Sequence, residues 1–138
     1  MDTYGSYFIK NVKSFKQKYK NCLIFKSMGT NLYYNFISNV DLVLGNSSSG
    51  IIEAPAAKTP TLDIGSRQVG RLKSSSIFSC DLNIKKIIRS IKIILKKNKF
   101  FYKNIYYKKE TKKLIVNNLL KILKRNKIEP KKFYDIKF

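Results

Sequence analysis

Apolar residues in the first part of the chain recur at the spacing of a helix. The members of this row are Tyr4, Phe8, Val12, Phe15 and Tyr19. Because residues three, four or seven positions apart share one helix face, the row predicts an amphipathic helix over residues 4–19. Asp2 or Thr3 can cap its start, since a short polar side chain accepts a hydrogen bond from a first-turn amide.

Two short apolar runs enclose a second predicted helix. We expect residues 22–25 to form a buried strand, residues 27–29 to form a turn, and Thr30 to cap the helix that follows. The apolar face of this helix consists of Leu32, Tyr33, Phe36 and Ile37. Residues 40–44 are almost continuously apolar and of strand length, which is typical of a parallel strand covered on both faces.

A Ser-rich stretch after Gly45 leads into a third predicted helix. Ser47, Ser48 and Ser49 form a polar loop that caps this helix, with Glu53 in its first turn or close to it. A strand over residues 60–64, a loop bracketed by Gly65 and Gly70, and a strand over residues 76–80 follow.

The second half of the chain carries two helical patterns. The first pattern consists of Ile84, Ile87, Ile88, Ile91, Ile94 and Leu95 and is capped by Asn83. The second consists of Leu114, Ile115, Leu119, Ile122 and Leu123 and begins near Thr111. Residues 99–109 form an aromatic and basic linker, and residues 127–138 show no clear period.

Strands that alternate with helices in units of about 20 residues predict an α/β fold with a parallel sheet and right-handed crossovers. Ligands of such sheets lie beyond the carboxyl ends of the strands. Here those ends are the turn at Ser27, the loop over residues 46–49 and the loop over residues 65–70.

Net charge adds a second picture. The chain has 29 Lys and Arg residues against 8 Asp and Glu residues, a formal charge of +21. Residues 1–84 carry a net +5 and residues 85–138 a net +16. A basic surplus favours polyanion binding. However, 25 of the 29 cations are Lys, and the chain also holds 18 Ile and 12 Asn, a bias that A/T-rich codons explain equally well.

Several kinds of site are absent from the sequence. The chain has no His, which excludes a His-containing zinc site and a Ser-His-Asp or Cys-His pair within it. Cys22 and Cys80 lie in apolar runs without CxxC spacing, and we expect both to be small buried side chains. No uncharged run approaches the ~18 residues needed to span a bilayer, and no signal peptide is recognisable. We therefore predict a cytoplasmic protein without metal, cofactor or membrane partner.

The loops at the strand ends combine three features of a nucleoside diphosphate site. The serines, with free amides at a helix start, suit an anion, although a plain N-cap explains them too. Glu53 can accept hydrogen bonds from a ribose diol, or it can simply complement the helix dipole. Arg67 offers a planar fork of donors for phosphate, or it is a solvated loop charge.

Two segments carry a resemblance to a known family. These are GNSSSGIIEAP, residues 45–55, and PTLDIGSRQVGR, residues 60–71. In this order and spacing they strongly resemble the hydrolysing UDP-N-acetylglucosamine 2-epimerases, enzymes that open sialic-acid and legionaminic-acid type pathways. The similarity begins at DTYG, residues 2–5, reaches about Cys80 and continues more loosely through the helix after Asn83.

The resemblance implies a fold and a set of roles. It implies the C-terminal half of a two-domain, glycosyltransferase-B-like fold, with a partial Rossmann-like parallel sheet that binds UDP. Ser47 and Ser48 would hold the diphosphate, Glu53 the ribose hydroxyls, and Arg67 would help to close the site. Met28, through its backbone, and Tyr33 would lie near the uracil. The implied reaction is elimination of UDP followed by hydration to a free N-acetylmannosamine-type sugar.

The sequence also departs from the family. Members need an N-terminal domain with acidic catalytic residues and a His near the first strand of the C-terminal domain. This chain contains neither, so we assign it no catalytic residue. We expect residues 1–98 to be a truncated UDP-binding domain and residues 99–138 a basic helical extension. We expect the chain to be a fragment that is inactive alone and needs a separate N-terminal polypeptide for activity. The unmet interdomain face would favour instability or a homodimer. The sugar stays open between UDP-N-acetylglucosamine and UDP-diacetamido-trideoxyhexoses.

The alternative hypothesis is a basic nucleic-acid or anionic-surface binding module over residues 85–137. Aromatic side chains interleave with Lys there, so bases could stack while Lys follows the phosphates. A solvated helix face with packing aromatics explains the same pattern. We therefore do not expect nucleic acid as a partner.

Overall fold

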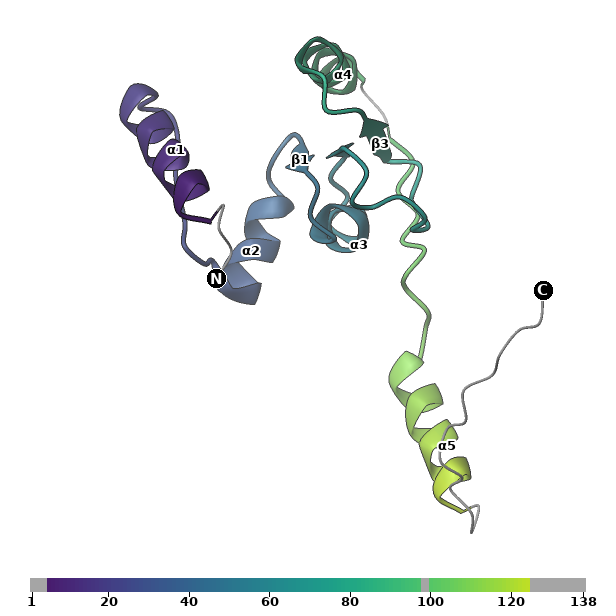
Figure 1. The fold of residues 1–138 in the computed structure, drawn as a ribbon. Coiled ribbons are helices and arrows are strands. Elements are labelled where there is room, and N and C mark those ends of the chain that lie inside the picture. Colours follow the sequence, from purple (N-terminus) through teal and green to yellow (C-terminus); the bar gives the residue numbers. More distant parts are fainter. Residues whose placement is uncertain (1–4, 98–99, 125–138) are drawn as a thin grey trace, which may run out of the picture.

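The computed structural model describes residues 5–97 and 100–124, and its centre is a parallel sheet (Figure 1). The strands are β1 (Val43–Gly45), β2 (Thr61–Ile64) and β3 (Ile77–Cys80), in the order β1-β2-β3. Leu62 pairs with Leu44 on one side and with Phe78 on the other. The predicted α/β class with a partial, parallel Rossmann-like sheet is thus confirmed.

Two helices cover opposite faces of this sheet (Figure 1). Helix α3 (Ser49–Ala56) connects β1 to β2 and contacts all three strands, whereas α4 (Ile84–Lys96) follows β3 and contacts β2 and β3. The core between these layers is small and aliphatic. It consists of Ile51 and Ala54 from α3, Leu62 and Ile77 from the sheet, and Ile94 from α4.

Helix α3 lies unusually close to β2 at Gly50. The Thr61 hydroxyl donates to the Gly50 carbonyl at 2.9 Å. A Cβ atom on Gly50 would stand 2.7 Å from Cγ2 of Thr61, which is closer than such atoms approach. The helix can therefore settle on the sheet only because residue 50 has no side chain.

The loop between β2 and β3 returns to the sheet through an ion pair. Lys73 Nζ lies 2.9 Å from Asp63 Oδ2 and donates to the Ser79 hydroxyl at 2.7 Å. Because side chains alternate along a strand, Asp63 points to the same face as Thr61, the face that α3 covers. Asp63 is 1% exposed, so its charge depends on Lys73 for compensation.

The predicted helices are present with nearly the expected bounds. They are α1 (Gly5–Lys18), α2 (Gly29–Ile37), α4 and α5 (Thr111–Leu123). Asn83 caps α4 as predicted, since its Oδ1 accepts from the Lys86 amide at 3.1 Å. The predicted cap at Thr30 is wrong, because α2 begins one residue earlier and Met28 occupies the cap position without a side-chain bond.

The predicted strand over residues 22–25 is wrong. These residues form no ladder with β1, which lies at the edge of the described sheet. A strand needs a neighbour to accept its backbone hydrogen bonds, and none of the described strands lies beside this segment. Leu23 is consequently 72% exposed. The expectation of two buried thiols is also wrong, since Cys22 and Cys80 are both half-buried and free.

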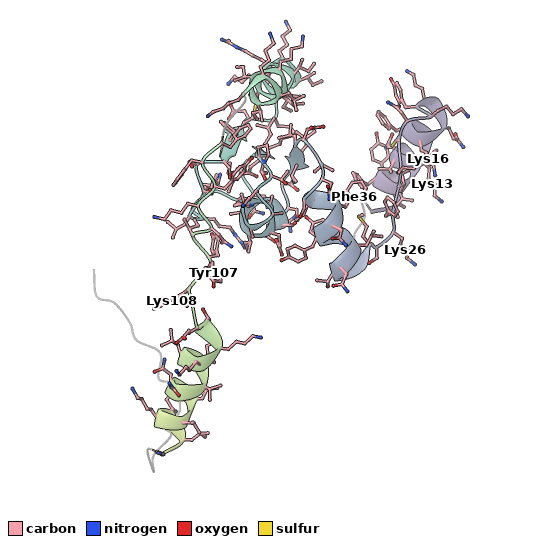
Figure 2. The ribbon with its side chains drawn as sticks, turned by 180° about the vertical axis from the view of Figure 1, so that it is seen from behind. Lys13, Lys16, Lys26, Phe36, Tyr107 and Lys108 are labelled. Atoms are coloured by element: carbon pink, nitrogen blue, oxygen red, sulfur yellow. The ribbon has the colours of Figure 1, made fainter. Side chains whose placement is uncertain are left out.

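Helices α1 and α5 lie off the sheet in both views (Figures 1 and 2). Figure 2 shows Tyr107 and Lys108 in the segment that leads down to α5. Upstream of it, the Tyr106 hydroxyl donates to the Leu72 carbonyl at 2.9 Å, and the Ser75 hydroxyl donates to the Phe101 carbonyl at 2.7 Å. The predicted cap at residues 2–3 and the tail over residues 127–138 lie outside the described residues, and the domain division at residue 98 stays a prediction.

None of the helices in the described ranges combines the length and the apolar character that crossing a bilayer requires.

Candidate functional site

A cavity of about 450 Å³ lies where α2 begins and the loop after β1 enters α3. Met28 and Tyr33 line it from the side of α2. Ser47, Ser49 and Glu53 line it from the other side. Four of the six residues predicted for the UDP site, Met28, Tyr33, Ser47 and Glu53, therefore share one cavity.

A hydrogen bond between the Tyr33 hydroxyl and the Ser49 hydroxyl joins the two walls of this cavity. Burial raises the pKa of Tyr33 above its ordinary value of 10.0, and the nearby negative charge of Glu53 and then Tyr34 raise that pKa further. Tyr33 therefore stays neutral at physiological pH and can both donate and accept hydrogen bonds.

Glu53 lines the cavity and carries a carboxylate oxygen without a partner. Its Oε2 atom is buried and has no hydrogen-bond partner among the described residues. A buried carboxylate oxygen without a partner is costly, and a ligand hydroxyl would remove that cost. Glu53 is the fifth residue of α3, close to the first turn, as the sequence predicts.

The Ser-rich loop uses several of its amides internally. The Ser49 amide donates to the Ser47 hydroxyl at 3.3 Å, and the amides of Gly50 and Ile51 donate to the carbonyls of Ser47 and Ser48. The expectation of free amides at this helix start is therefore wrong for these three residues. Ser48 stands at the cap position of α3 with a helical backbone, and its hydroxyl makes no cap bond.

The loop after β2 directs two neighbouring side chains to different places. Arg67 is exposed and does not line the cavity between α2 and α3. The next residue, Gln68, is 3% exposed, and its side-chain amide donates to the Asn46 carbonyl at 2.8 Å. Gln68 thus ties the loop after β2 to the loop after β1. Sequence reasoning missed Gln68 because its only signal was its place between two glycines.

Comparisons with known proteins agree with one another. A family model described as UDP-N-acetylglucosamine 2-epimerase matches residues 2–120. This range includes β1, β2, β3 and the cavity-lining residues, and it extends through α4 into α5.

Three named relatives are similar to the chain. The polysialic acid biosynthesis protein P7 of Escherichia coli is 31% identical over 98% of this chain and 35% of its own length. The UDP-N,N'-diacetylbacillosamine 2-epimerase (hydrolyzing) of Legionella pneumophila is 31% identical over 74% of this chain and 27% of its own length. The GDP/UDP-N,N'-diacetylbacillosamine 2-epimerase (hydrolyzing) of Campylobacter jejuni is 40% identical over 44% of this chain and 16% of its own length. The chain thus spans at most about a third of the relatives it matches.

Proposed function

Since the chain belongs to the hydrolysing UDP-N-acetylglucosamine 2-epimerase family, we propose that its cavity between α2 and α3 binds the UDP part of a UDP-sugar. The observation that carries this proposal is the buried, unpartnered Oε2 of Glu53, a residue that lines that cavity. A ribose diol supplies two hydroxyl donors, and a charged acceptor strengthens each hydrogen bond.

The other predicted residues take roles that suit their positions. The hydroxyls of Ser47 and Ser48 bind the diphosphate at the start of α3, where the helix dipole favours negative charge. Met28, through its backbone, and Tyr33 lie against the uracil at the start of α2. Arg67 joins the site only when its loop closes over the ligand, because its side chain lies outside the unliganded cavity.

The whole enzyme would eliminate UDP and then hydrate the resulting glycal to a free N-acetylmannosamine-type sugar. We propose that the acid and base groups for these steps come from outside these 138 residues, from a separate polypeptide or from an assembly of chains. The chain's share of the reaction is then to hold and orient the leaving nucleotide.

A UDP titration tests the site. By calorimetry we expect Glu53→Gln to weaken UDP binding about 10- to 100-fold, the loss of hydrogen bonds to a charged group. Ser48→Ala should weaken it about fivefold, the loss of one neutral hydrogen bond. Glu110→Gln and Ser14→Ala are matched controls, because both residues are exposed and distant in sequence from the cavity. UDP affinity equal to that of the parent in both site variants would refute the site.

The choice between uracil and guanine needs its own test, since one relative is named for both GDP and UDP. We expect UDP to displace a bound fluorescent UDP analogue at lower concentration than GDP does, because the family model that matches the chain is that of a UDP-sugar enzyme. Equal displacement by the two nucleotides would mean that this cavity does not select the base.

A turnover assay tests the proposal that the acid and base groups come from outside these 138 residues. The purified chain should release no UDP from UDP-N-acetylglucosamine, because the described cavity offers Glu53 as its only charged group, and that group is assigned to the ribose. Release at the rate of a full-length relative would overturn the proposal that the catalytic groups lie elsewhere.

The comparisons give no support to the alternative of a nucleic-acid or anionic-surface binding module over residues 85–137. The family match includes residues 85–120 of that segment.

A further inference from the structure

A second and larger cavity, of about 780 Å³, wraps the carboxyl end of β3. Gly65 and Ser66 line it from the loop after β2, and Cys80 and Asp81 line it from the end of β3. The first turns of α4 supply the remaining wall. This cavity shares no lining residue with the cavity between α2 and α3.

Cations converge on the second cavity from both faces of the sheet. Lys73 comes from the loop on the α3 side, and Lys86 and Arg89 come from α4. Asp81 is the only acidic residue of its lining. The cavity between α2 and α3 has the opposite character, because its only charged lining residue is Glu53.

The hydrogen bonds of these cations leave donors for a ligand. Lys73 Nζ bonds Asp63 and Ser79, and Lys86 Nζ bonds Asp81 at 2.6 Å. Each ammonium group has three donors, so both keep at least one. Arg89 has no hydrogen-bond or ion-pair partner within residues 5–97 and 100–124, so its five N–H donors are available there. Asp63 offsets the charge of Lys73 and Asp81 offsets that of Lys86, whereas no described acidic residue pairs with Arg89.

We propose that this cavity is a second ligand site, which binds a small molecule bearing phosphate groups and is separate from the proposed UDP site. The planar fork of Arg89 takes two oxygens of one phosphate group. The remaining N–H groups of Lys73 and Lys86 and the hydroxyls of Ser66 and Ser90 lie around the same space. The cavity has a larger volume than one phosphate group fills, so it leaves room for an organic part of the ligand.

Cys80 provides a reporter inside this cavity. Its thiol lies close enough to Lys86 to add slightly to the raised pKa of that ammonium, which the hydrogen bond and charge of Asp81 chiefly raise. The chain has two cysteines, so a Cys22→Ser variant leaves Cys80 as the single thiol. Cys22 does not line this cavity, so the substitution leaves the site intact. The experiment measures alkylation of Cys80 by anionic iodoacetate and by neutral iodoacetamide, with and without pyrophosphate.

We expect the iodoacetate-to-iodoacetamide rate ratio to be higher in the folded chain than in urea, because the cations attract the anionic reagent. Pyrophosphate should slow both reagents more than sodium chloride of equal ionic strength does. Arg89→Gln should lower the rate ratio and weaken the pyrophosphate protection about tenfold, because the variant loses one charge-assisted interaction with a phosphate group. Lys92→Gln, which removes a charge from α4 outside this cavity, should change neither by more than about twofold.

Three results would overturn the proposal. The first is protection by pyrophosphate no greater than that by sodium chloride. The second is an equal loss in Arg89→Gln and Lys92→Gln, which would indicate general surface charge. The third is competition between UDP and pyrophosphate that does not level off at saturating UDP and that Glu53→Gln weakens in parallel, which would make this cavity part of the UDP site. Calorimetry of Arg89→Gln with UDP separates the two proposals, because we expect that affinity to equal the parent's.

Discussion

Glu53 influences the pKa of Tyr33 across the first cavity. Burial is the larger cause of the raised Tyr33 pKa, and the charge of Glu53 is the next. We therefore predict that Glu53→Gln lowers the pKa of Tyr33 toward 10.0 without reaching it, because the burial remains. Carbon-13 NMR of the labelled tyrosine ring during a pH titration measures this value.

The same raised pKa has a consequence for stability. Since folding favours the protonated phenol, its stabilising effect is complete below pH 10.0 and is lost as the pH rises through the folded pKa. Tyr33→Phe should therefore lose less stability than the parent between pH 9 and 11, a range chosen around the ordinary tyrosine pKa of about 10. An identical loss in both proteins would contradict this assignment.

Gly50 tests the contact between α3 and β2. Gly50→Ala should destabilise the fold by about 1 to 3 kcal/mol, the usual cost of overpacking, because the new methyl group meets Cγ2 of Thr61. Urea unfolding measures the change. Gly5→Ala is the matched control, since nothing lies within 4 Å of that position and alanine favours a helix.

A second substitution makes the Gly50 test specific. Thr61→Ser removes Cγ2 and keeps the hydroxyl that donates to the Gly50 carbonyl. In the Gly50→Ala background this change should recover part of the lost stability. If it lowers stability further instead, the close approach is not the cause.

At the level of elements, the cap of α4 is the clearest local contribution. Asn83→Ala should lower the free energy of unfolding by about 1 kcal/mol, because the Lys86 amide loses its acceptor. Asn83→Asp should keep most of the stability, since aspartate accepts the same hydrogen bond at a helix start. Asn117→Ala, within exposed α5, is a control for removing an Asn without a cap role.

The helices were easier to predict than the strands for a physical reason. The apolar rows of α1, α4 and α5 and the Asn83 cap are local patterns, and a helix satisfies its own backbone. The apolar run over residues 22–25 looked equally convincing, but a strand exists only beside a partner. Sequence shows the run and not the partner.

The candidate site was partly predictable for a similar reason. Met28, Tyr33, Ser47 and Glu53 meet because the start of α2 adjoins the loop after β1. Topology implied the place of the loop after β1, whereas the turn before α2 follows no strand in the described part of the chain. The exposure of Arg67 and the inward position of Gln68 depend on the direction in which each side chain leaves the turn. Spacing between glycines does not encode that direction.

At the scale of the whole molecule, charge and apolar surface oppose each other. The chain carries +21 in total, while α1 and α5 expose Phe8, Phe15, Leu119 and Leu123. Exposed apolar faces of this kind favour association, and the net charge resists it. We predict that the purified chain self-associates more strongly as sodium chloride rises, because salt screens the repulsion.

Sedimentation velocity at several salt concentrations measures this association. Leu119→Lys together with Leu123→Lys should reduce it, whereas Lys112→Gln, on the same helix, should not. A single monomeric boundary at every salt and protein concentration would contradict the prediction.

The hydrogen bond from Gln68 to Asn46 links the two cavities. Asn46 adjoins Ser47 of the first cavity, and Gln68 lies between Ser66 and Val69 of the second. A ligand that orders one loop should therefore alter the affinity of the other cavity for its ligand. We predict that UDP and pyrophosphate change each other's dissociation constant by the same factor, as thermodynamic linkage requires, and that Gln68→Ala brings this factor to one.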